Sequence, residues 1–144
     1  MNNLLFPIRT KYKKQHKRNY KLPKEPKLNF GEIGIYTLEP FWFTSKQIEA
    51  CRKTILKYTK RTGKIFIKIF PDQPITKRTE DSRMGTGKGS VDHWVSLINK
   101  GKMLFELKDI PLTIAKQALK QVMFKLPVKT KIYEKNRYST ISKT

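Results

Sequence analysis

The chain of 144 residues carries 32 Lys or Arg residues against 11 Asp or Glu residues, which gives a formal net charge of +21. Self-repulsion of this size opposes a compact free molecule, so we expect a polyanionic partner, with nucleic acid the first candidate and an anionic membrane surface the second. A single cysteine and two distant histidines argue against a disulfide framework or a metal site, and no apolar run is long enough to span a bilayer.

The first 27 residues contain nine Lys or Arg residues and one acidic residue, Glu25. Pro7, Pro23 and Pro26 disfavour a helix in this stretch. The pattern predicts an extended basic arm that becomes ordered on nucleic acid, with its cations on phosphates and rings such as Tyr12 on bases. A charged arm of this kind can also be a disordered, solvated tail, and the residues alone leave that alternative open.

The residues after the arm predict a strand, an aromatic cluster and a helix. The strand lies within Gly31–Leu38, and Phe41–Phe43 are expected in the core. Thr44 and Gln47 fit the two key positions of a capping box, and Gly63 fits the C′ position where the helix ends. The apolar face of this helix is predicted to comprise Ile48, Cys51, Ile55 and Tyr58.

The middle of the chain predicts strands separated by one long connection. A strand is predicted over Lys64–Phe70, followed by a polar connection without secondary structure over Ile75–Ser90. Val91–Ile98 and Lys102–Lys108 are predicted to pair as a hairpin. The acidic residues around the long connection are expected to pair with nearby cations: Asp72, Glu80 and Asp81 with Lys77, Arg78 or Arg83.

A second helix is predicted to start at Pro111 and to stop before Pro127, with an apolar stripe of Ile114, Ala115, Ala118, Leu119, Val122 and Met123. A last strand follows at Val128–Tyr133. The order of elements predicts an α+β fold, in which two helices cover a largely antiparallel sheet. The expected organisation is a basic arm over 1–30, a globular domain over 31–134 with a projecting loop over 71–90, and a tail over 135–144.

Three glycines alternate with Thr86 and Lys88 in the segment Arg83–Ser90. Because glycine has no side chain, backbone N–H groups and cations in such a loop can approach a polyanion closely. The segment is not a P-loop, since Ser82 stands where that motif needs a glycine and Gly89 follows the lysine. A flexible surface loop remains the alternative interpretation.

Catalytic chemistry is not indicated anywhere in the chain. No pair of carboxylates lies in an apolar setting, and no Ser/His/Asp or Cys/His arrangement can be assembled. We therefore expect no enzyme and no cofactor. The outer face of the first helix is basic, and acidic partners are lacking after Glu49, so Arg52 is interpreted as a phosphate contact.

Several short motifs match those of one family. They are Arg9-Thr10-Lys11-Tyr12, Lys14-Gln15-His16, Gln47-Ile48-Glu49-Ala50, Phe70-Pro71-Asp72, Pro74-Ile75-Thr76-Lys77, Arg83-Met84-Gly85, Gly87-Lys88-Gly89, Trp94-Val95, Leu104-Phe105-Glu106 and Lys125-Leu126-Pro127. Through them the chain resembles the bacterial-type large-subunit ribosomal protein L-sixteen family, over roughly Phe6 to Tyr133.

The resemblance implies an α/β sandwich bound to large-subunit rRNA near the aminoacyl-tRNA site and the peptidyl transferase centre. It implies tRNA and neighbouring ribosomal proteins as further partners, with no membrane association and no homo-oligomer. Combined with the cations of the arm and the first helix, it gives these expected RNA-binding residues: Arg9, Lys11, Tyr12, Lys13, Lys14, Gln15, His16, Lys17, Arg18, Arg52, Lys77, Arg83, Met84, Gly85, Gly87, Lys88 and Gly89.

The chain departs from the family pattern at three places. Thr86 stands where the family usually has Lys, Ile8 replaces a basic residue, and Lys21–Asn29 lacks a glycine-rich continuation.

Heavy use of Lys and Ile with little Ala indicates an AT-rich genome, so we expect an organelle-encoded protein, with the mitochondrial matrix ahead of the plastid stroma and the bacterial cytoplasm. The alternative hypothesis is that the chain is a DNA-binding architectural protein of the nucleoid type, and a third hypothesis is that it is a membrane-surface protein.

Overall fold

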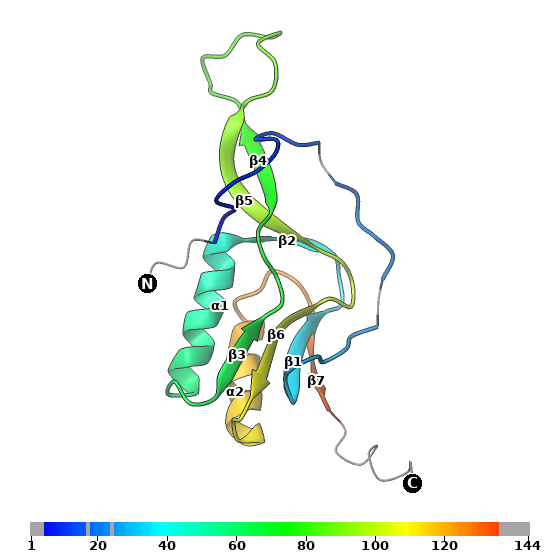
Figure 1. Ribbon diagram of the computed structural model, residues 1–144, viewed down its shortest axis with the longest axis vertical. Coiled ribbons are helices and arrows are strands. Elements are labelled where there is room, and N and C mark those ends of the chain that lie inside the picture. Colours follow the sequence, from blue (N-terminus) through cyan, green and yellow to red (C-terminus); the bar gives the residue numbers. More distant parts are fainter. Residues whose placement is uncertain (1–4, 17, 24, 136–144) are drawn as a thin grey trace.

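The computed structural model describes residues 5–16, 18–23 and 25–135 (Figure 1). Within this part of the chain the elements are β1 (Ile33–Thr37), β2 (Phe41–Thr44), α1 (Ser45–Tyr58), β3 (Lys64–Ile67), β4 (Gln73–Lys77), β5 (Ser90–Ile98), β6 (Met103–Lys108), α2 (Leu112–Met123) and β7 (Thr130–Glu134). The predicted contact residue Lys17, and the expected tail beyond residue 135, lie outside the described residues.

The strands form two antiparallel sheets, with the orders β3-β6-β1-β7 and β2-β5-β4. Figure 1 shows the helices beside the four-stranded sheet, whereas β4 and β5 extend away from them and carry a long loop at their far end. The α+β class is confirmed. The strands divide between two sheets where we expected one, and the second sheet is the part that projects.

The predicted hairpin between Val91–Ile98 and Lys102–Lys108 is wrong. β5 pairs with β2 and β4, whereas β6 pairs with β1 and β3. The turn between β5 and β6 is bonded to the end of β1, since Gly101 N donates to Thr37 O at 2.8 Å and Thr37 N donates to Lys102 O at 3.3 Å. β1 therefore occupies the place beside β6 that a hairpin would give to β5.

Both helices pack into one apolar core with the four-stranded sheet. Ile33 and Ile35 of β1 lie opposite Leu107 and Phe105 of β6, and the helices add Ile48, Cys51, Ile55, Ala115, Leu119 and Val122. Cys51 is fully buried in this core, as its place on the apolar face of the helix predicts, and burial raises the pKa of its thiol to about 11. The main apolar faces of both helices are thus committed to the core rather than to a membrane surface.

The predicted capping box of α1 is confirmed. Gln47 N donates to Thr44 Oγ1 at 3.3 Å, and Thr44 N donates to Gln47 Oε1 at 3.0 Å. The predicted helix end is wrong, because α1 ends at Tyr58. Tyr58 was expected on the apolar face, but the residue is 42% exposed. Lys60 and Arg61 take the left-handed conformation after the helix, with φ of +50° and +63°. Gly63 follows in a separate turn.

The long connection predicted over Ile75–Ser90 is wrong in its first part, because β4 pairs with β5 from Gln73 to Lys77. Pro71 and Pro74 concealed this strand, since proline removes a hydrogen-bond donor from a ladder. A proline is tolerated in β4 because β4 is the edge strand of its sheet.

The C-terminal elements match the prediction apart from their ends. α2 begins directly after Pro111 and ends at Met123, before Pro127, and β7 begins at Thr130 rather than at Val128. Four residues of the predicted apolar stripe are buried, namely Ala115, Ala118, Leu119 and Val122. Ile114 is 38% exposed. The predicted strand over Lys64–Phe70 likewise ends early, at Ile67.

Replacement of the α1 cap tests the local energetics of this fold. Thr44→Ala removes the hydroxyl that accepts from Gln47 N, and we expect the free energy of unfolding to fall by about 1 kcal/mol in urea denaturation. Thr113→Ala, at an exposed position in the first turn of α2, is the matched control and should change it by less than ~0.5 kcal/mol. Equal losses in the two variants would show that the cap contributes nothing specific.

Candidate nucleic-acid interface

The root of the basic arm is fixed by one buried carboxylate. Glu106 in β6 is fully buried, and its Oε2 accepts hydrogen bonds from Asn29 N at 3.2 Å, Phe30 N at 2.8 Å and Gly31 N at 2.9 Å. A buried carboxylate is costly unless its oxygens are bonded, and three successive N–H donors satisfy this one. A Cβ at Gly31 would lie 2.7 Å from the Cβ of Glu106, so only glycine permits this approach.

The far end of the arm lies against the glycine loop, which here means residues 83–89. Lys14 Nζ donates to Lys88 O at 2.6 Å, and Lys88 Nζ donates in return to the backbone oxygen of Gln15. Figure 1 shows the first part of the arm crossing β4 and β5 just below the loop. Segments more than 70 positions apart in the sequence therefore form one surface, called the arm–loop surface below.

Three further contacts hold the arm on the β2-β5-β4 sheet. Arg18 forms an ion pair with Asp72 at 3.1 Å, Gln73 Nε2 donates to the backbone oxygen of His16 at 3.3 Å, and Lys21 N donates to Asn99 Oδ1 at 3.0 Å. The predicted pairing of Asp72 with a cation of its own loop is wrong. The arm places Arg18 beside this carboxylate.

The glycines of the loop have different roles. Gly85 and Gly87 have φ of +92° and +84°, and a Cβ at either position would meet nothing within 4 Å. They are needed for conformation and leave the backbone open to a partner. Gly89 is needed for space, because a Cβ there would collide with the backbone carbonyl of Lys77.

The other loop residues define a short, exposed turn. Thr86 Oγ1 donates to Arg83 O at 2.7 Å, so this residue braces the turn where the family usually has a lysine. Met84 is 89% exposed, and Arg78 donates to its sulfur at 3.4 Å. Arg83, Met84 and Lys88 are exposed on a turn that Thr86 braces.

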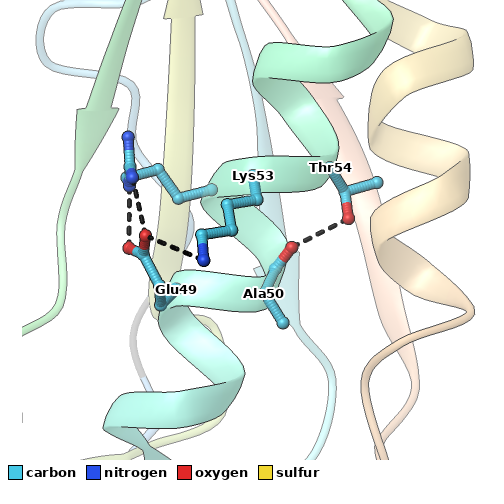
Figure 2. A network of polar contacts seen from close by, with 5 residues as sticks. Glu49, Ala50, Lys53 and Thr54 are labelled. Atoms are coloured by element: carbon cyan, nitrogen blue, oxygen red, sulfur yellow. Dashed lines mark hydrogen bonds and ion pairs between the residues drawn. The ribbon is translucent and has the colours of Figure 1, made fainter.

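Arg52 lies on α1 and belongs to a different contact. Its guanidinium donates twice to Glu49, at 2.8 and 2.6 Å, and Lys53 lies 3.9 Å from the same carboxylate (Figure 2). The hydrogen bond to Arg52 holds the pKa of Glu49 below its usual value. We expected that acidic partners could not account for the basic face of this helix. That expectation is wrong for Arg52, because Glu49, three positions earlier, is its acidic partner.

Sequence reasoning missed the residues that receive the arm. These are Glu106, Asp72, Gln73 and Asn99. The one available signal was Glu106, an acidic residue inside the apolar run of β6, because a charge at a core position requires bonded partners.

The fold and the arm–loop surface together indicate the class of protein to which the chain belongs. The chain is strongly cationic, its arm and loop meet through cations and backbone oxygens, and its described residues hold no group of three or more metal-ligating side chains. No helix among the described residues is long and apolar enough to cross a membrane. These features are typical of a small α+β protein that binds a structured polyanion.

Comparison with known proteins identifies the family. Residues 7–133 match the family model described as Ribosomal protein L16p/L10e. Among similar proteins, the large ribosomal subunit protein uL16c of Gracilaria tenuistipitata is 48% identical over 92% of this chain and 99% of its own length. The proteins of the same name from Euglena longa and Phaeodactylum tricornutum are 50% and 47% identical, over 92% and 94% of this chain and 100% of theirs.

The chain therefore belongs to the ribosomal protein L16p/L10e family. It is a structural constituent of the large ribosomal subunit and not an enzyme, associated with large-subunit rRNA and ribosomal proteins. This excludes the nucleoid-type alternative. The relatives are plastid proteins, which favours a plastid over the mitochondrion that we expected.

The anchor of the arm gives a test that does not need RNA. Glu106→Gln keeps the shape of the side chain but removes its negative charge, so the one oxygen left to face the amides of residues 29–31 accepts weaker hydrogen bonds. We expect hydrogen exchange of these amides to accelerate about tenfold or more, equivalent to ~1.4 kcal/mol. Glu80→Gln, at an exposed loop position, should leave their exchange unchanged. Unchanged exchange in Glu106→Gln would contradict the anchoring role.

Proposed function

We propose that the protein binds large-subunit rRNA through the arm–loop surface, beside the aminoacyl-tRNA site of a plastid ribosome. The observation that carries the proposal is the exchange of hydrogen bonds between the arm and the loop, in which Lys14 and Lys88 each donate to a neutral backbone oxygen of the other segment. An ammonium has three donors, and each group uses one in the contact described, so further donors remain for phosphate oxygens.

The glycine loop supports close approach to RNA. Its backbone at Gly85 and Gly87 has open space where side chains would stand, so RNA can approach the main chain directly. We infer from the family resemblance that this loop lies nearest to the peptidyl transferase centre and the bound tRNA. Here Thr86 braces the turn instead of adding a cation, so RNA contact at the tip rests on Arg83, Met84 and Lys88.

The remaining arm residues extend the same surface. The described cations Arg9, Lys11 and Lys13 are exposed, as is Tyr12, whose ring lies 5.4 Å from Lys11 Nζ. Exposed rings beside cations suit single-stranded or irregular RNA, where bases stack and phosphates pair. Arg52 and Lys77 are secondary proposals, and the proposal for Arg52 requires RNA to compete with Glu49.

The salt dependence of RNA binding tests this function. Lys88→Ala should reduce the slope of log K against log salt by about 0.7–0.9, because one phosphate is no longer neutralised by the protein. The binding partner is a transcript of the large-subunit rRNA from the source organism. Lys116→Ala is the matched control, because Lys116 lies on α2 and pairs with Glu134 at 2.8 Å.

The control should leave the slope unchanged. Equal slopes for the wild type, Lys88→Ala and Lys116→Ala would show that the loop lysine binds no phosphate. Weakened binding in both variants to the same extent would mean that charge alone, rather than the arm–loop surface, drives association.

A further inference from the structure

A cavity of about 180 Å³ lies where the arm crosses the β2-β5-β4 sheet. Its apolar lining includes Trp42, Pro74 and Leu97 from the three strands, and its cationic lining is Arg18 and Lys88 from the arm and the loop. This volume is smaller than the roughly 300 Å³ at which drug-sized ligand pockets begin, and it suits one planar ring system. Apolar walls beside two cations match a nucleotide, which has an apolar ring face and an anionic phosphate.

Arg18 provides a fixed planar surface in this cavity. Its NH1 group is bonded to Asp72 at 3.1 Å and its NH2 group to Gln15 Oε1 at 3.1 Å, so both ends of the guanidinium are held. The side chain is nevertheless 54% exposed. An immobilised guanidinium plane is a stacking surface for an unpaired RNA base.

Gln73 adds a polar group beside the same cavity. The residue is 4% exposed, and its Nε2 donates to His16 O at 3.3 Å, which fixes the orientation of the amide. Its Oε1 is a buried acceptor, and among the described residues it has no hydrogen-bond partner. Nε2 keeps a second N–H, but Oε1 is the unsatisfied atom of this amide, and it can accept from an N–H group of a base that displaces its cover.

We propose that this cavity holds a single unpaired base of the rRNA, stacked on Arg18 with its N–H edge toward Gln73 and its phosphate beside Lys88. The inference rests on the proposed rRNA binding and names a site within that surface. Every base presents an N–H group on its Watson–Crick edge, so the cavity selects an extruded base rather than a particular sequence.

Chemical probing of the protein bound to its rRNA tests this site. Wild-type protein should protect the Watson–Crick edge of one unpaired base from dimethyl sulfate or carbodiimide, next to a hydroxyl-radical footprint of the arm. Arg18→Lys keeps the charge but removes the plane, and Leu97→Trp fills the cavity. Both should reduce base protection about fivefold or more, the order expected when one base no longer stacks.

The backbone footprint separates the two proposals. Arg61→Lys, an exposed control after α1, should leave base and backbone protection unchanged. A backbone footprint without a protected base, or base protection that survives both variants, overturns the cavity proposal and leaves rRNA binding intact. Absence of any footprint with the wild-type protein overturns the proposed function, and the cavity proposal with it.

Discussion

The mutual hydrogen bonds between Lys14, Lys88 and the facing backbone oxygens are the interaction that the proposed RNA-binding surface requires. They join the basic arm to the glycine loop and create a surface that neither segment has alone. Both lysines donate to neutral backbone oxygens, so their charges are not neutralised by this contact, and the net charge of +21 repels itself. Phosphate groups relieve this repulsion. The geometry is therefore consistent with a protein whose natural environment is RNA.

The two sheets have different roles: one forms the hydrophobic core with the helices, and the other supports the arm and the loop. The four-stranded sheet and both helices bury the apolar core, and this sheet also carries Glu106, which fixes the start of the arm. The three-stranded sheet projects from that base, supports the loop, and receives the arm through Asp72 and Gln73. The arm is thus anchored at both of its ends. Because it is already ordered in the free protein, RNA binding has to offset a smaller loss of conformational entropy.

Sequence reasoning succeeded where structure is decided locally. The capping box of α1, the apolar stripe of α2 and the need for glycine at Gly85 and Gly87 all follow from neighbours within a few positions. It failed where partners are distant: β5 prefers β2 and β4 over β6, and Pro74 hid an edge strand. The RNA-binding residues were named from charge and family motifs, but their assembly was not predictable, because Glu106, Asp72 and Gln73 receive the arm through contacts that no local pattern encodes.

A density map of the large ribosomal subunit from the source organism would show whether the arm–loop surface meets rRNA. We expect arm residues 9–18 and loop residues 83–89 to lie side by side against rRNA, with the ammonium groups of Lys14 and Lys88 toward phosphates. A map in which the arm runs apart from the loop, or in which that paired surface faces solvent, would contradict it.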